Sequence, residues 1–248
     1  MPPFWRKQFW STSIYRKKLR MRERLSIVLA AIAALLLANN LHQMFLVLPD
    51  EAMQGAIYRI LFFHAPAAMV GMIGYFVALT LSIMYLSFGS FKYDSLAASV
   101  IEVSLVFSLV NIVTGSIWAR IIWGIWWTWD YRLTSALVCI LIFSGYLLLR
   151  RAIDEPTQRA RLSSALCIFG CVDVVIVWKS IEWFRNQHPG PVLDFRTGGG
   201  RMDPAMSHVF YMNFLALLLV ATALVLIRTR QESTAREIDS LRRLAHAA

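Results

Sequence analysis

The sequence has few charged residues: Asp, Glu, Lys and Arg together make up 16% of its 248 residues, whereas hydrophobic residues make up 58%. A soluble domain of this size carries about 25% charged residues. The shortage excludes an ordinary soluble globular fold and predicts an integral membrane protein. The chain is long enough for about six membrane spans of roughly 20 residues each.

Cysteine is also scarce. The three cysteines, Cys139, Cys167 and Cys171, lie inside apolar runs, where cysteine behaves as a small hydrophobic side chain, so we expect no disulfide and no thiol chemistry. No Cys-x-x-Cys-His sequence is present, which argues against a c-type cytochrome. A cleaved signal peptide is not expected, because the basic region before Leu25 is too long and the apolar run after it has the length of a membrane span.

Six apolar runs predict the membrane spans. Each is too long for a strand and lacks the alternation of a strand, so all six are expected to be helices. Their approximate limits are residues 25–48, 66–88, 97–117, 133–149, 162–178 and 205–227. We therefore predict an all-α integral membrane protein, with one domain of six transmembrane helices over residues 1–248.

The basic residues predict the orientation of these helices. Eighteen of the 25 Lys and Arg residues flank one side of the predicted domain and seven flank the other. Cytoplasmic flanks are the richer in Lys and Arg, so the first side, which carries both termini, is expected to be cytoplasmic. The net charge of +10 arises from these flanks and predicts contact with membrane lipids, not with nucleic acid.

This orientation divides the chain into tails and loops. Residues 1–24 become a basic cytoplasmic tail, and residues 228–248 a second cytoplasmic tail. A capping-box pattern from Thr234 to Glu237 predicts that the second tail forms a short amphipathic helix on the membrane. In a bacterial inner membrane, residues 118–132 and 179–204 would both face the periplasm.

Residues 118–132, which we call the tryptophan segment, hold five of the nine tryptophans: Trp118, Trp123, Trp126, Trp127 and Trp129. An aromatic belt at a membrane surface explains about one or two tryptophans at a helix end, not five in one connection. So much indole surface beside Asp130 and Arg132 favours a large, flat, anionic aromatic ligand held out of water, and haem fits that description.

The local conformation of the tryptophan segment bears on this interpretation. If residues 123–130 were helical, Trp123, Trp126, Trp127 and Asp130 would share one face, which could lie against a porphyrin. Anchoring at the lipid headgroups is the alternative. Asp130 is expected to pair with Arg132 or another basic neighbour and to hold the segment in shape.

Two histidines are expected on the same outward side. His64 begins the second span, and His188 lies in the loop of residues 179–204. Neutral imidazole is the usual nitrogen ligand of haem iron, and two imidazoles can fill both axial positions. A lone histidine at a membrane surface is more often structural, but two beside a tryptophan-rich segment favour ligation.

Four further charged residues complete the prediction. Arg59 and Arg132 suit haem propionates, because a guanidinium binds a carboxylate through two parallel hydrogen bonds, although either could simply flank a span. Glu102 and Asp173 lie inside predicted spans, where charge is costly. For both acidic residues we expect structural pairing in preference to proton transfer.

At these residues the sequence resembles the haem-handling proteins of cytochrome c maturation that carry a tryptophan-rich WWD motif. Within that group it is most similar to the six-span family of cytochrome c maturation protein C (CcmC). The resemblance runs from about Gln54 to Met206. It rests on Tyr58-Arg-Ile with His64-Ala-Pro-Ala-Ala, Val113-Thr-Gly-Ser, Trp-Gly-x-Trp-Trp-x-Trp-Asp-x-Arg-Leu-Thr over residues 123–134, Ser180-Ile-Glu-Trp with His188, and Asp203-Pro-Ala-Met.

The resemblance implies a protein that is not an enzyme and that binds haem b as transient cargo at the periplasmic face. It would pass the haem to the membrane-anchored haem chaperone CcmE. His64 and His188 would be the axial ligands, the tryptophan segment would contact the porphyrin and the chaperone, and Arg59 and Arg132 would neutralise the propionates. The implied partners are the ABC-transporter-like subunits CcmA and CcmB and the one-span subunit CcmD.

Two alternatives stay open at this point. The first is a haem-binding WWD subunit of a cytochrome c synthase similar to CcsA, although those proteins are usually longer, with more spans and additional intramembrane histidines. The second is a small-solute permease or quinone-binding subunit that uses the tryptophans only as a membrane anchor. A permease should show internal repeats or broken helices with polar residues at mid-membrane, and the sequence shows neither.

Overall fold

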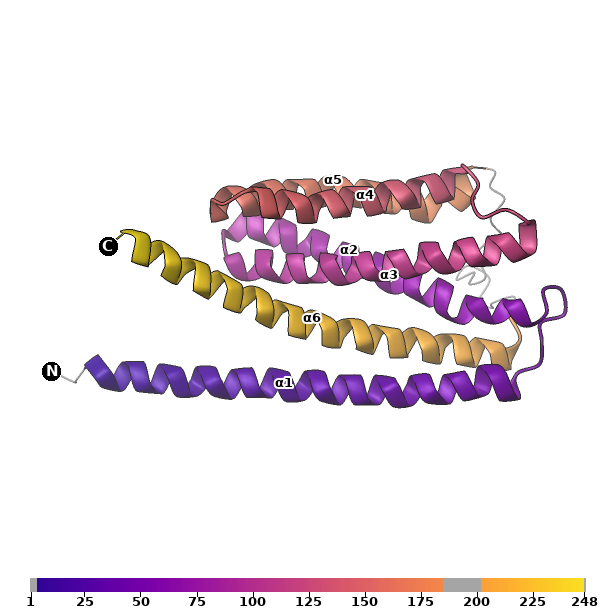
Figure 1. Cartoon of the computed structure of the whole chain (residues 1–248), viewed down its shortest axis with the longest axis horizontal. Coiled ribbons are helices and arrows are strands. Elements are labelled where there is room, and N and C mark those ends of the chain that lie inside the picture. The colour runs from indigo at the N-terminus through magenta and orange to yellow at the C-terminus, as the bar shows by residue number, and fades with distance from the viewer. Residues whose placement is uncertain (1–3, 185–201, 248) are drawn as a thin grey trace.

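The computed structural model describes residues 4–184 and 202–247. This part of the chain is almost entirely helical and contains no strand. Six long helices run roughly along one direction (Figure 1), and each is long and apolar enough to cross a membrane. They are α1 (Phe4–His42), α2 (Leu61–Phe88), α3 (Phe91–Trp123), α4 (Tyr131–Ala152), α5 (Pro156–Trp183) and α6 (Pro204–Ala247). The predicted all-α fold with six spans is confirmed.

The helices are longer than the apolar runs that predicted them. The run of residues 97–117, for example, lies within α3, which extends further at both ends. Helices end where the backbone is capped, not where hydrophobicity stops. Thus α2 and α3 end at Gly89 and Gly124, whose φ angles of 67° and 76° lie in the left-handed region that glycine tolerates.

Both predicted tails are continuations of helices. The basic tail of residues 1–24 is helical from Phe4 onward, as the first part of α1. The capping-box pattern at Thr234 does not begin a separate amphipathic helix, because α6 runs unbroken through it to Ala247. Helix α6 contains neither glycine nor an internal proline after Pro204, so nothing in its sequence interrupts the backbone hydrogen bonds.

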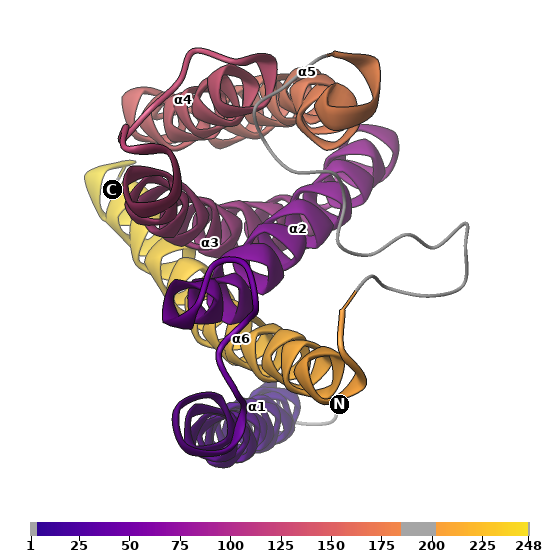
Figure 2. The same ribbon diagram turned by 90° about the vertical axis from the view of Figure 1, so that its right-hand side faces the viewer.

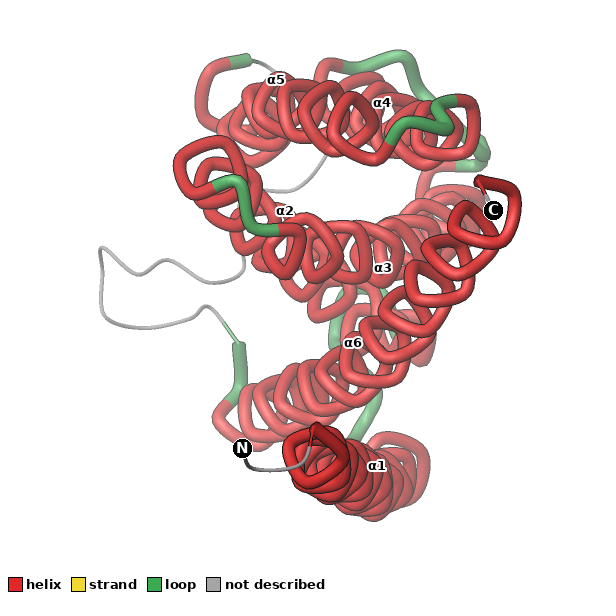
Figure 3. The backbone as a smooth tube through the Cα atoms, turned by 90° about the vertical axis from the view of Figure 1, so that its left-hand side faces the viewer, coloured by secondary structure: helices red, strands yellow, loops and turns green. Residues whose placement is uncertain are grey.

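The helices pack as three pairs. Figure 2 shows α2 and α3 in the middle, α4 and α5 on one side of them, and α6 with α1 on the other. Helix α1 is the outermost member of its pair and packs against α6, as the view from the opposite end also shows (Figure 3). The start of α1 and the end of α6 lie at the same end of the bundle.

Two buried amide side chains link the first helix, the last helix and α2. Asn40 of α1 donates to the side-chain oxygen of Asn213 of α6 over 2.9 Å. Asn213 in turn donates to the backbone oxygen of Phe62 in α2, also over 2.9 Å. Both amide side chains are buried. Polar pairs of this kind join helices where the surroundings offer no water.

Small residues allow α2 and α3 to approach closely. A β-carbon added to Gly74 would lie 1.9 Å from the hydroxyl oxygen of Ser104, and one added to Gly71 would lie 3.1 Å from that of Ser108. Close contact between helix backbones is a common packing mode in membranes. Here it brings the first turns of α2 against the last third of α3, where the candidate site lies.

The cysteines and the intramembrane acids test the remaining expectations about the core. Cys139, Cys167 and Cys171 are buried and free of disulfides, as predicted. Glu102 pairs with Arg228 over 2.6 Å, so the expected pairing is present. The same expectation for Asp173 is wrong: its buried carboxylate oxygen Oδ2 has no hydrogen-bond partner among the residues that the structure describes.

Candidate functional site

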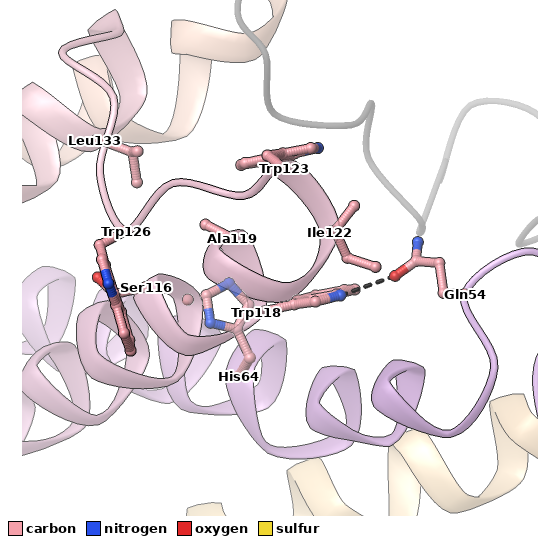
Figure 4. A pocket seen from close by; sticks show the side chains of 10 residues that line it. Gln54, His64, Ser116, Trp118, Ala119, Ile122, Trp123, Trp126 and Leu133 are labelled. Carbon is pink, nitrogen blue, oxygen red and sulfur yellow. Dashed lines mark hydrogen bonds between the residues drawn. The ribbon is translucent and has the colours of Figure 1, made fainter.

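The site is built around His64, which lies one turn inside α2. A 3₁₀ turn (Ala56–Ile60) leads into this helix from Gly55, whose φ angle is 66°. The imidazole points from α2 towards α3 and lies beside the ring of Trp118 (Figure 4). An added β-carbon on Gly115 would lie 2.8 Å from Cε1 of the imidazole, so only glycine leaves room for this side chain.

Both ring nitrogens of His64 have polar neighbours on α3. Nδ1 lies 3.0 Å from the backbone oxygen of Asn111 and 3.1 Å from the hydroxyl oxygen of Thr114. The Thr114 hydroxyl itself donates to the backbone oxygen of Val110, so its oxygen is an acceptor towards Nδ1. Both oxygens suit an N–H at Nδ1, and the side-chain nitrogen of Asn111, which is a donor, lies 3.2 Å from Nδ1 and 3.3 Å from Nε2.

The side chain of Asn111 also holds this arrangement in place. Its amide nitrogen donates to the backbone oxygen of His64 over 3.0 Å. That oxygen lies in the first turns of α2. Asn111 therefore joins α3 to α2 at the level of the imidazole through both its backbone and its side chain.

A cavity of about 170 Å³, which we call the His64 cavity, opens beside this imidazole. Apart from His64 it is walled mainly by aromatic and small or aliphatic side chains (Figure 4). The lining residues are Gln54, His64, Gly115, Ser116, Trp118, Ala119, Ile122, Trp123, Trp126 and Leu133. Three of the five tryptophans in the tryptophan segment thus meet His64 in one place.

Trp118 is fixed on three sides. Its ring lies edge-on to His64, with centroids 5.7 Å apart, and edge-on to Tyr58, with centroids 6.2 Å apart. Its indole nitrogen donates to the side-chain oxygen of Gln54 over 2.8 Å. The Gln54 backbone N–H is bound in turn by the carboxylate of Glu51 at 2.7 Å. These contacts tie the loop that precedes α2 to α3.

The helical arrangement considered for residues 123–130 is wrong. Helix α3 ends at Trp123, and residues 124–130 have no regular structure, so Trp123, Trp126, Trp127 and Asp130 share no helix face. Gly124 ends α3 in the left-handed conformation. Asp130 begins α4, because its carboxylate accepts from the backbone N–H of Leu133 over 2.8 Å. Asp130 shapes the segment as predicted, but as a helix cap and not as a partner of Arg132.

The outer tryptophans present their rings to the surroundings. Trp126 is 60% exposed and Trp129 is 77% exposed. Trp127 packs edge-on against Trp129, with centroids 5.8 Å apart. Its indole N–H is buried and finds no acceptor within the described part of the chain. The segment therefore lines the His64 cavity on one side and offers apolar aromatic surface on the other.

Arg132 and Arg59 occupy different positions. Arg132 lines a second cavity of about 60 Å³, which continues inward from His64 between α2, α3, α4 and α5. It donates to the backbone oxygen of Val177 over 3.2 Å and so ties α4 to α5. Arg59 lines neither cavity. It pairs with Asp50 and donates to the backbone oxygens of Met44 and Leu48, at 2.5 and 3.1 Å.

The predicted ligand His188 lies in residues 185–201, outside the described residues. Three site residues were missed by sequence reasoning: Gln54, Asn111 and Gly115. Asn111 carried a usable signal, because a polar side chain inside an apolar run is costly. Gly115 belongs to the Val113-Thr-Gly-Ser motif, but its role depends on the approach of α2. Gln54 has no signal in the sequence, since its contact with Trp118 depends on the path of the loop.

Comparison with known proteins identifies the family of this chain. The family model described as Heme exporter protein C matches residues 8–244 of the chain, which includes part of every helix. The chain belongs to the Heme exporter protein C family. The predicted resemblance is thereby confirmed.

Curated members of the Heme exporter protein C family are similar over most of their length. The protein of Bradyrhizobium diazoefficiens is 33% identical over 213 residues, which cover 86% of this chain and 80% of the relative. The protein of Paracoccus denitrificans is 32% identical, over 78% of this chain and 80% of the relative. That of Escherichia coli is 32% identical over 73% of each chain. All three relatives carry the name Heme exporter protein C.

Proposed function

We propose that this chain is a haem-handling membrane protein of cytochrome c maturation, which binds haem b as cargo at His64 and passes it to the haem chaperone CcmE. Its membership of the Heme exporter protein C family supports the general role. The specific site rests on one observation: the imidazole of His64 borders a cavity that three tryptophans line.

The contact between Nδ1 of His64 and the Asn111 carbonyl supports a role for His64 as an iron ligand. Histidines that ligate metals usually donate their other ring N–H to a carbonyl or carboxylate, which fixes the ring and raises its basicity. The Nδ1 hydrogen bond to the Asn111 carbonyl supplies this support from α3. Nε2 is then the nitrogen that coordinates the iron.

The lining of the His64 cavity suits one face and one edge of a porphyrin. At about 170 Å³ the cavity is smaller than the roughly 300–1,000 Å³ of pockets that enclose a drug-sized ligand. The macrocycle would therefore lie partly outside it, against Trp123 and Trp126. Its other face would meet a second ligand, for which His188 is the proposed residue.

The charged residues of the site differ in how well they could bind a haem propionate. Arg132 lines the inner cavity next to His64, so it is the favoured partner for a propionate. Arg59 is engaged by Asp50 and two backbone oxygens, which makes a propionate contact depend on rearrangement of that loop. Asp130 contributes by holding the start of α4.

The exposed indoles suggest how the haem leaves. Trp126 and Trp129 stand at the surface of the bundle end, where an incoming protein can reach them. Tryptophan is enriched in protein interfaces because it buries a large apolar area. We assign this surface to CcmE. The orientation with both termini in the cytoplasm, the inner-membrane location and assembly with CcmA, CcmB and CcmD belong to the same proposal.

The proposal is tested by the visible absorption spectrum of the detergent-purified protein, oxidised and reduced, with and without co-expressed CcmE. We expect a low-spin Soret band and a sharp reduced α-band. Both should be lost in His64→Ala and His188→Ala. They should be kept in His208→Ala, the matched control, because His208 is an exposed residue of α6 that lines neither cavity. A six-coordinate spectrum that persists in His64→Ala would refute the ligand assignment. If no haem is bound under any of these conditions, the alternative that the tryptophans only anchor the protein in the membrane is favoured.

A further inference from the structure

A second polar centre lies at the opposite end of the bundle, where α1 begins and α6 ends. Its core is Asp94 of α3, which is 1% exposed. Arg150 of α4 binds this carboxylate through both nitrogens, at 2.7 and 3.2 Å, and Arg236 of α6 binds it as well. Arg150 lies 5.7 Å from the ring centre of Tyr146, and Arg236 lies 5.5 Å from that of Phe91.

Further carboxylates neutralise the arginines of this centre. Glu232 of α6 binds both Arg150 and Arg236, each at 3.2 Å. Arg228 is bound by Glu102 at 2.6 Å and also pairs with Glu232, at 3.8 Å. Three arginines and three carboxylates therefore form one connected set of ion pairs between α3, α4 and α6.

Arg159, in the first turns of α5, lies outside this set. Within the described residues it forms no ion pair, and its buried Nε–H has no hydrogen-bond partner. Arg151 likewise forms no ion pair with a described residue. A buried guanidinium N–H without an acceptor is costly, so Arg159 is a donor that a ligand could satisfy.

Two cavities adjoin Arg159. One, of about 170 Å³, is lined by the four arginines Arg150, Arg151, Arg159 and Arg228 but by only two acids, Glu102 and Glu232. The other, of about 320 Å³, is lined by Arg159 and Arg236 with the single acid Asp239. Arg150, Arg228 and Arg236 are already paired, so the surplus positive charge is that of Arg159 in both cavities, joined by Arg151 in the first. An anion is the ligand that this surplus favours.

We propose that the two cavities around Arg159 bind a phosphate group, that of an anionic phospholipid headgroup. Guanidinium groups bind phosphate oxygens through charge-assisted hydrogen bonds. Basic pockets between transmembrane helices at the level of the headgroups are suited to anionic lipids. The proposal does not depend on haem binding and concerns the other end of the molecule.

The surroundings favour a lipid over a soluble phosphate. The cavities lie at the turn between α2 and α3 and the turn between α4 and α5, where the spans reach the membrane surface. Their walls include the apolar side chains of Phe91, Pro156 and Leu147. Leu162, one turn beyond Arg159, is exposed. A glycerol backbone and acyl chains can follow this apolar surface, whereas inorganic phosphate gains nothing from it.

The test titrates the delipidated full chain with phosphatidylglycerol or phosphatidylcholine in detergent and counts bound lipid by native mass spectrometry. Arg159→Gln should weaken phosphatidylglycerol binding by about tenfold, since it removes a charged donor. Arg161→Gln removes the same charge from an exposed position of α5 and should change binding less than about twofold. Phosphatidylcholine should bind weakly to all three proteins.

Further arms separate the possible results. The thermal unfolding temperature of Arg159→Gln should match that of the wild type, because Arg159 belongs to no ion pair of the described chain. If this variant fails to fold, Arg159→Lys replaces it, since lysine keeps the charge but loses the paired N–H donors of the guanidinium. If inorganic phosphate at millimolar concentration displaces phosphatidylglycerol, the ligand is not specifically a lipid and that part of the proposal is wrong. Equal losses in Arg159→Gln and Arg161→Gln, or no loss in either, would overturn the site.

Discussion

The imidazole of His64 packs against the backbone of Gly115, so closely that a methyl group there would lie 2.8 Å from Cε1 of the ring. Real β-carbons do not approach other atoms to this distance, so one of the two groups must move. The position of the proposed iron ligand is thus set by a residue with no side chain, on a different helix.

Gly115→Ala should displace the His64 ring and weaken haem binding by at least about tenfold, because an off-rotamer side chain costs about 0.5–1.5 kcal/mol and the Nδ1 hydrogen bond is strained as well. Haem titration followed at the Soret band measures the effect. Gly145→Ala is the matched control, since a β-carbon at Gly145 meets nothing within 4 Å. Equal haem affinity in both variants would show that the ring has room to move.

The hydrogen bond between Trp118 and Gln54 should couple the loop before α2 to α3. Trp118→Phe keeps an aromatic ring but removes the N–H, and Gln54→Leu removes the acceptor. Each change should lower the free energy of unfolding by about 1 kcal/mol, and the double variant should lose less than the sum. Thermal unfolding in detergent gives the coupling energy. Strict additivity would mean that the bond contributes nothing to stability.

Asp94 should be the most sensitive charged residue in the described chain. Asp94→Asn leaves Arg150 and Arg236 without their shared carboxylate in a buried place, and breaking a buried ion pair costs about 3–5 kcal/mol. The same measurement on Glu23→Gln is the control, because Glu23 pairs with Arg230 at an exposed site, 3.3 Å apart. That variant should lose less than about 1 kcal/mol. Similar losses in the two variants would contradict the assignment.

Asp173→Asn should not destabilise the protein. The buried oxygen of Asp173 has no donor in the described residues, so a neutral amide of the same shape removes a desolvation cost. We expect a free energy of unfolding equal to that of the wild type or higher by about 1 kcal/mol. A loss of that size would instead reveal a hydrogen bond or ion pair to Asp173 in the folded protein.

The number and type of helices could be predicted because both follow from local properties of the chain. Twenty consecutive apolar residues must satisfy their own backbone groups in a membrane, and only a helix does so within one segment. The ends of the helices could not be read from hydrophobicity in the same way. Trp118 and Trp123 lie on α3 because the helix continues to its glycine cap at Gly124.

The candidate site was only partly predictable, because its residues meet through packing. The motif around His64 and the tryptophans identified the chemistry, since those residue types are uncommon together. The neighbours that orient the imidazole, Asn111 and Gly115, depend on how closely α2 approaches α3, which Gly71 and Gly74 permit. Arg59 and Arg132 looked equivalent in sequence, yet Arg132 lines a cavity and Arg59 lines neither, because backbone oxygens of Met44 and Leu48, just after α1, engage Arg59.

The hydrogen bond between Asn40 and Asn213 spans 173 positions of the sequence and joins the first helix to the last. A ribosome delivers α1 to the membrane long before α6 exists. Until then the amide of Asn40 sits in lipid without its partner, and α1 has no neighbour to pack against for most of its length. We therefore expect the fold to close only after synthesis of the sixth helix, and a chain truncated before α6 should leave α1 without its main packing partner, held through residues 43–60.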